Sequence, residues 1–322
     1  MIINRSVTSM KHFLKETDFS IQEATDIFLL AQKYKNDRGH DNPSVLNNQS
    51  WALLFYKTST RTRVSFEVGI NELGGHPLYL DKDTMQLSRG ESVADTAKIL
   101  SRYCHGLIIR TYDHKIVEEF ASEGTITVVN ALTDFLHPCQ IFSDAFTLAE
   151  HWSEDSNITS LKDRKIVFIG DCNSNMANSW ILGGHLFSMN VVLSGPETFA
   201  PGKEINDHLD KAGITNAYTF TTDIHEAIED ADVIYTDVWV SMGKENEEAI
   251  RTKKLSPYKV TLDHFNAAKK DALFMHCLPA HLEMEVSPDV YYNSKSVVFD
   301  QAENRLHMQK AILTSLAGSN KT

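Results

Sequence analysis

The first apolar residues of the chain recur at the spacing of one helix face. A capping pair, Ser20 and Glu23, precedes and overlaps this pattern. The spacing predicts an amphipathic helix over residues 21–34; its apolar positions are Ile21, Ala24, Ile27, Phe28 and Ala31. Residues 51–56 then form a short apolar run of the length of a buried strand.

Beyond this point short apolar runs alternate with helical patterns. The first set predicts strands at residues 76–81, 104–110 and 125–132, with helices at 65–73, 93–101 and 140–151. A polar stretch at 153–157 separates it from a second set, with strands at 165–170, 190–194, 232–236 and 272–276, helices at 176–186 and 224–228, and a closing helix at 304–316. This rhythm is typical of mainly parallel sheets flanked by helices. At 322 residues, the chain is expected to form two α/β domains, residues 1–152 and 153–303.

The charge and the cysteines narrow the function classes. A net charge of −12 repels phosphate polymers, so we expect no nucleic-acid partner. The cysteines lack the close spacing of a zinc site or a disulfide framework; they are Cys104, Cys139, Cys172 and Cys277. No apolar run approaches the roughly 20 residues that span a bilayer, and the first residues lack a signal core. We therefore expect no membrane segment, no metal site and a reducing, cytoplasmic location.

A polar turn follows the apolar run 51–56 and leads into a helical pattern. A helix start offers backbone N–H groups and partial positive charge to an anion. Hydroxyls and an arginine that can grip phosphate through two parallel hydrogen bonds add to this; they are Ser59, Thr60, Arg61 and Thr62. A solvated basic edge explains Lys57 and Arg63, but it explains the hydroxyls around Arg61 less well. The turn therefore favours phosphate or carboxylate binding.

The run Ser59-Thr60-Arg61-Thr62-Arg63-Val64-Ser65-Phe66-Glu67 resembles the carbamoyl-phosphate signature shared by aspartate and ornithine carbamoyltransferases. Further motifs of this family follow in order over essentially the whole chain. The resemblance implies a carbamoyl-phosphate-binding domain, residues 1–152, to which a C-terminal helix, 304–322, returns. It implies an ornithine-binding domain over residues 153–303. It implies no cofactor.

Two motifs complete the expected carbamoyl-phosphate site. Arg110 ends a strongly apolar run and so needs an anion or a wet cleft, and His137-Pro138-Cys139-Gln140 opens a helix. The resemblance implies that Arg110, His137 and Thr62 contact the carbamoyl oxygen and that Gln140 contacts the amine. It also implies contacts of Cys277, Leu278 and Arg305 with carbamoyl phosphate. The alternatives without a role in binding are that His137 is an ordinary loop histidine and that Arg305 is paired with Glu303.

Three segments of the second half bear on which amine receives the carbamoyl group. Asp171-Cys172-Asn173-Ser174-Asn175 follows a strand and lacks the glycines of a dinucleotide site. The resemblance implies that Asn175 binds the amino-acid end of L-ornithine and that Asp237, which can pair with its α-ammonium, does so too. It also implies that a Ser-Met-Gly loop with Ser241 and Met242 closes over it. His276-Cys277-Leu278-Pro279 resembles the signature of the ornithine enzymes. Cys277 either accepts a proton from the amine or positions it.

The resemblance also bears on assembly and on rival functions. The loop around Gln86 resembles one that reaches into a neighbouring subunit's site, which implies a homo-oligomer, most simply a trimer. Within the class, putrescine and N-acylated ornithine remain alternative acceptors. If the chain were a binding or regulatory protein that keeps the fold without catalysis, we would expect the loss of at least one of four residues. These are Arg61, Arg110, His137 and Cys277, and all four are present. The sequence leaves open whether the reaction runs toward citrulline or backward.

Overall fold

The computed structural model describes residues 10–41, 43–240, 243 and 245–319. Its N-terminal half holds a four-stranded parallel sheet in the order β2-β1-β3-β4. The strands are β1 (Ser50–Phe55), β2 (His76–Asp81), β3 (Gly106–Arg110) and β4 (Thr127–Leu132). The helices of this half are α1 (Ile21–Asn36), α2 (Thr60–Glu72), α3 (Val93–Tyr103), α4 (His114–Glu123) and α5 (Pro138–Trp152).

Alternation along β1 explains why both faces of this sheet are covered. Trp51, Leu53 and Phe55 point into one hydrophobic cluster with α1, α2 and α5. Ala52 and Leu54 point into another cluster, formed with α3 and α4. Successive side chains of a strand face opposite sides, so a continuous apolar run is what a sheet buried on both faces requires.

The C-terminal half holds a five-stranded parallel sheet in the order β7-β6-β5-β8-β9. Its strands are β5 (Lys165–Ile169), β6 (Asn190–Ser194), β7 (Thr219–Thr221), β8 (Val233–Thr236) and β9 (Leu273–His276). Its helices are α6 (Asn175–Phe187), α7 (Lys203–Ala212), α8 (Ile224–Ile228), α9 (Glu248–Leu255), α10 (Leu262–Ala267) and α11 (Pro288–Tyr291). The expected α/β architecture with two mainly parallel sheets is confirmed.

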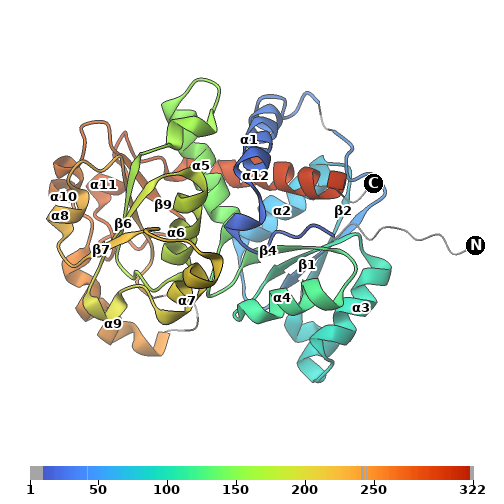
Figure 1. Ribbon diagram of the computed structural model, residues 1–322. Coiled ribbons are helices and arrows are strands. Elements are labelled where there is room, and N and C mark those ends of the chain that lie inside the picture. The colour runs from blue at the N-terminus through green and yellow to red at the C-terminus, as the bar shows by residue number, and fades with distance from the viewer. Residues whose placement is uncertain (1–9, 42, 241–242, 244, 320–322) are drawn as a thin grey trace, which may run out of the picture.

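Two long helices tie the halves together (Figure 1). Helix α5 is buried at every position from Pro138 to Ala149, as befits a segment between two sheets. Helix α12 (Val298–Ser319) begins near β9 and packs on α5, α1 and α2. The expected return of the C-terminal helix to the N-terminal domain is thereby confirmed.

Some predicted helix limits are wrong. Helix α2 begins at Thr60 rather than at residue 65, because the Ser59 side chain caps it by accepting a hydrogen bond from the Thr62 N–H (3.3 Å). Helix α12 begins at Val298 rather than at residue 304. Every predicted strand is present, but strand β7, helix α4 of the first half and several helices of the second half lie outside the predicted elements.

The strand order determines where the ligand-binding residues lie. In each sheet the direction in which strands are added reverses beside the strand that comes first in the sequence. The reversal lies between β1 and β3 in one sheet and between β5 and β8 in the other. Ligands collect at such switch points, outside the carboxyl ends of the strands. The register sets Phe55 beside Arg110, and Thr236 beside both Ile169 and His276. The residues that follow these strands therefore meet at one edge of each sheet. Among the described residues no helix is long and apolar enough to cross a membrane.

Candidate active site

One cleft lies between the carboxyl edges of the two sheets. Residues from both halves line it, among them most of those singled out in the sequence: Ser59, Thr60, Arg61, Thr62, Arg110, His137, Gln140, Asn175, Asp237, Cys277, Leu278 and Arg305. Gln86 lies on a short exposed helix, η3 (Gln86–Arg89), and does not line this cleft. Ser241 and Met242 lie outside the described residues.

The hydroxyl-rich run forms the first turn of α2. Ser59 is the N-cap and Thr62 is buried, so the helix start faces the cleft with its partial positive charge. The Arg61 guanidinium donates from Nη2 to the carbonyl oxygen of Leu278 (2.6 Å). Arg61 thus links the first sheet's helix to the turn that follows β9.

Arg110 and Arg305 bring more positive charge to the same place. Both are buried, at 9% and 3% exposed. Burial and then the neighbouring Arg305 and Arg61 lower the pKa of Arg110 to about 10, and burial also lowers the pKa of Arg305. The Nε of Arg110 has no hydrogen-bond partner within the described part of the chain. A buried guanidinium with an unused donor is an anion-binding group.

The contacts of Arg305 exclude its alternative role. It donates from Nη2 to Thr62 Oγ1 (3.4 Å) and from Nη1 to Gln140 Oε1. Glu303 Oε1 lies instead 3.6 Å from Nε2 of His307 on the same helix. The alternative of an Arg305–Glu303 ion pair is therefore not found among the described residues.

His137 is the N-cap residue of α5, and Pro138 takes the first helical position, as the motif indicated. Its backbone N–H donates to the Ser179 hydroxyl of α6 (2.7 Å), which fixes the loop across the two halves. Burial, followed by the charges of Arg305 and Arg110, holds the pKa of His137 well below its ordinary value of 6.5. The imidazole is therefore neutral and can donate one N–H to an oxygen that gains negative charge.

Lys57 is a site residue that the sequence did not single out. It is buried (9% exposed), and its Nζ pairs with Asp134 (2.6 Å) and lies 4.5 Å from the ring centroid of Tyr112. All three residues line the cleft. The interpretation of Lys57 as part of a solvated basic edge is wrong, because its side chain is buried. The sequence could not predict this, since Asp134 and Tyr112 come from later segments that no local pattern connects to Lys57.

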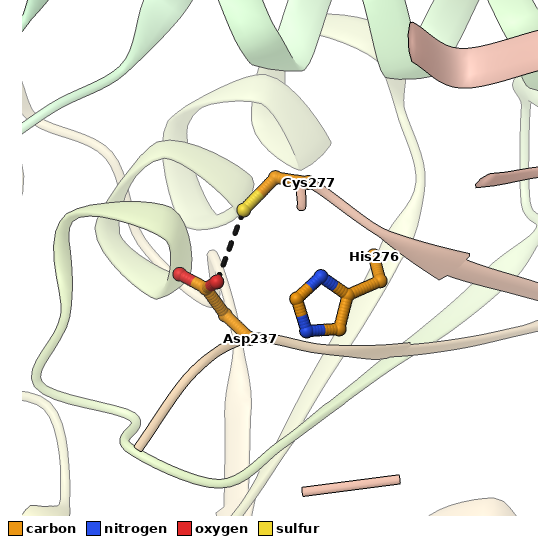
Figure 2. Close-up of side chains that lie close together, drawn as sticks. All are labelled: Asp237, His276 and Cys277. Carbon is orange, nitrogen blue, oxygen red and sulfur yellow. Dashed lines mark hydrogen bonds between the residues drawn. The ribbon is translucent and has the colours of Figure 1, made fainter. Parts of the chain in front are cut away.

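Asp237 and Cys277 meet at the ends of β8 and β9 (Figure 2). The Cys277 thiol donates to Asp237 Oδ1 (3.0 Å). Burial, followed by the adjacent Asp237, raises the pKa of Cys277 well above its ordinary value of 9.0. Burial also raises the pKa of Asp237. The thiol is therefore protonated, and its hydrogen is donated to the Asp237 carboxyl group.

His276 supports the turn behind Cys277. Its Nδ1 accepts the Leu278 N–H (2.9 Å), and its Nε2 lies 3.2 Å from Oε1 of the fully buried Glu285. These bonds hold Leu278 in a left-handed conformation, with a φ of 60°. One atom each of Asp237, His276 and Cys277 lie within 4.8 Å of one another, a spacing that suits a metal ion. To bind one, the His276 ring would have to release one of its two bonds.

Asn175 occupies the first turn of α6, behind the N-cap Ser174. Its Nδ2 donates to the backbone oxygen of Thr133 (2.7 Å), so the amide spans the two halves at the mouth of the cleft. In this arrangement a chain of anion-binding groups on one wall faces an acidic and polar wall on the other.

Comparison with known proteins places the chain. Residues 11–150 match the model of the aspartate/ornithine carbamoyltransferase carbamoyl-P binding domain, and residues 162–316 match that of the Asp/Orn binding domain. The chain belongs to the aspartate/ornithine carbamoyltransferase family.

Full-length relatives and solved structures agree with this family. The chain is 46% identical over 311 residues to an ornithine carbamoyltransferase of Bifidobacterium longum subsp. infantis, with 96% of each chain covered. It is 44% identical to that of Archaeoglobus fulgidus, covering 96% of this chain and 98% of that one. The structure of ornithine carbamoyltransferase from Pyrococcus furiosus superposes with a TM-score of 0.86 at 41% identity, covering 98% of this chain and 99% of that chain.

Proposed function

We propose that the cleft transfers the carbamoyl group of carbamoyl phosphate to the side-chain amine of L-ornithine, giving L-citrulline and phosphate. The observation that carries this is the convergence of three arginines and a neutral histidine opposite the Asp237–Cys277 pair. This is the activity named for the full-length relatives.

Carbamoyl phosphate lies along the wall of the first sheet. Its phosphate sits at the start of α2, held by the hydroxyls of Ser59, Thr60 and Thr62 and by Arg61, with Arg110 and Arg305 beside it. The carbamoyl oxygen points to Arg110, His137 and Thr62, and the carbamoyl amine points to Gln140 and to the Leu278 carbonyl oxygen. Donors fixed at an oxygen that becomes negative lower the barrier, because they need no reorganisation during the reaction.

Ornithine lies along the wall of the second sheet. Asp237 pairs with its α-ammonium, and Asn175 binds its amino-acid end. The attacking amine must be neutral, although a free alkylamine titrates at about 10.4. Positive charge on the opposite wall favours the neutral amine.

The chemical step forms one bond and breaks another. The amine nitrogen attacks the carbamoyl carbon, the bond from that carbon to the phosphate oxygen breaks, and phosphate leaves with the electron pair. The nitrogen releases one proton, which the departing phosphate can accept. Because the Cys277 thiol is protonated and donates a hydrogen bond to Asp237, it is not a free base, and we assign Cys277 to positioning rather than to proton abstraction.

We also propose a homo-oligomer, most simply a trimer, in which Gln86 reaches the cleft of a neighbouring subunit. Its place on an exposed turn away from its own cleft supports this. The four cysteines are unpaired, which supports a reducing compartment such as the cytoplasm.

The test is a turnover assay with carbamoyl phosphate and each of L-ornithine, putrescine and an N-acylated ornithine. We expect citrulline formation with ornithine to exceed product formation with the others in kcat/KM. A preference for putrescine would overturn the assignment of the acceptor. Arg61→Gln should lose most of the activity. Arg63→Gln is the matched control in the same turn, since its guanidinium pairs with Glu67 (3.1 Å) outside the cleft, and it should retain activity.

A further inference from the structure

Asp144 lies one turn beyond Gln140 on α5 and is fully buried. It does not line the cleft. Its Oδ1 accepts from Gln140 Nε2 (2.7 Å) and from Gln301 Nε2 of α12 (2.8 Å), and its Oδ2 accepts from the Tyr235 hydroxyl of β8 (2.8 Å). One carboxyl group thus collects hydrogen bonds from both halves of the molecule directly behind a cleft residue.

These contacts fix which way the Gln140 amide faces. Arg305 donates to its Oε1, and an arginine has no acceptor to offer to an amide nitrogen. On the other side, Asp144 Oδ1 also accepts from Gln301 Nε2, and an oxygen that acts as an acceptor can pair only with the nitrogen end of the Gln140 amide. With Nε2 held inward, the oxygen of Gln140 is the atom left to the cleft side.

The protonation of Asp144 does not change this orientation. Burial raises its pKa to about 7, so the group titrates near neutral pH. A proton would settle on Oδ2, where the Tyr235 hydroxyl can accept it, because Oδ1 faces two donors. Arg305 is the charged group that acts on Asp144 from α12, and it favours the ionised form without reversing the amide.

We propose that Asp144 is a positioning residue that makes the site select a carbamoyl group over an acetyl group of the same shape. The inference rests on the proposed function, in which Gln140 contacts the carbamoyl amine. The two groups differ in an NH₂ against a CH₃, and only the NH₂ can donate to Gln140 Oε1. If the Gln140 amide were rotated by half a turn, its own NH₂ would face the NH₂ of the ligand, and neither group could accept a hydrogen bond.

The experiment compares two stable analogues that differ only at this group. Phosphonoacetamide carries the amino group, and 2-oxopropylphosphonate carries methyl in its place. The dissociation constants of both are measured by calorimetry for the parent protein and for Asp144→Ala, with Asp144→Leu as a second variant that leaves a smaller cavity. We expect the preference for the amide to fall about tenfold, the worth of roughly one hydrogen bond. If both ligands weaken equally and the preference is kept, Asp144 is only structural and the proposal is overturned.

Two conservative variants decide the matter if the alanine and leucine variants do not fold. Asp144→Asn keeps an oxygen for the two amide N–H groups and should keep the preference within about twofold, well under the worth of one hydrogen bond. Tyr235→Phe removes only the partner of Oδ2 and should also keep it. A folded Asp144→Asn with a lost preference would overturn the proposal. A parent protein that makes no citrulline would instead overturn the proposed function, so the two failures are distinct.

Discussion

Glu16 is a fully buried carboxyl group on the short helix η1 (Glu16–Asp18), and its replacement by glutamine tests how its ionisation limits stability. Neither carboxyl oxygen has a hydrogen bond of normal geometry to another described residue. Burial raises its pKa from 4.5 to about 8, and the nearby Ser179 hydroxyl and Lys15 offset this only in part. The nearby Asp18 raises the pKa of Glu16 further, and Glu16 in turn helps to raise the pKa of Cys139 on α5.

The sign and the size of the change in the free energy of unfolding with pH follow from the pKa of Glu16 in the folded and in the unfolded chain. Between pH 4.5 and about 8 the folded protein keeps the Glu16 proton, whereas the unfolded chain releases it. The unfolded state binds fewer protons in this window, so the free energy of unfolding falls as the pH rises. At about 1.4 kcal/mol for each tenfold change in the acid constant, the loss is at most about 5 kcal/mol. Glu16→Gln removes it, because a neutral amide has no proton to lose.

Urea denaturation at pH 5.5 and pH 9, at one protein concentration, measures the effect. We expect the variant to gain a few kcal/mol over the parent on going from pH 5.5 to pH 9. Glu118→Gln, at an exposed position of α4, is the matched control and should show no such gain. A Glu16→Gln protein that tracks the parent at both pH values would refute the reasoning.

Further predictions concern the cleft and its frame. His137→Ala should keep its circular dichroism but lose about 10²–10³ in kcat, the worth of one donor at a developing oxyanion; unchanged turnover would remove it from the mechanism. Because burial keeps His137 neutral, kcat should show no inflection near pH 6.5, and one that is lost in His137→Gln would contradict this. Cys277→Ser keeps a donor to Asp237 and should cost less than about tenfold in kcat, one hydrogen bond's worth at most; a far larger loss would indicate proton abstraction. Arg251 pairs with Asp171, and both side chains are 5% exposed. Arg251→Leu should cost about 3–5 kcal/mol in urea denaturation because it leaves a buried carboxylate unpaired, whereas a loss under about 1 kcal/mol would place that pair in the range of surface ion pairs.

Local patterns were enough to predict the strands and the residues that follow them. Runs such as 51–56 and 165–170 are apolar on both faces, which only a covered parallel sheet requires, and ligand groups follow the carboxyl ends of such strands. The motifs around Arg61, His137 and Cys277 could therefore be placed at the carboxyl edges of the two sheets without coordinates.

Features made by distant partners could not be predicted in this way. Lys57 is held by Asp134 and Tyr112, and the Gln140 amide is oriented by Asp144 and Arg305. Each group alone suits a solvated surface or a helix face, and its role depends on a neighbour far along the chain. Helix α2 was placed too late because its first turn is built from hydroxyl and charged residues rather than apolar ones.

The central claim is that both substrates lie in one cleft, with the phosphate at α2 and the amino acid at the ends of β8 and β9. A crystal structure with a bisubstrate analogue, in which a phosphonoacetyl group is joined to the side-chain nitrogen of ornithine, tests it most directly. The account predicts the phosphonate on Arg61 and the first turn of α2, the amide oxygen on Arg110 and His137, and the α-ammonium on Asp237. An analogue bound in the reverse direction, or with its amino-acid end outside the cleft, would contradict it.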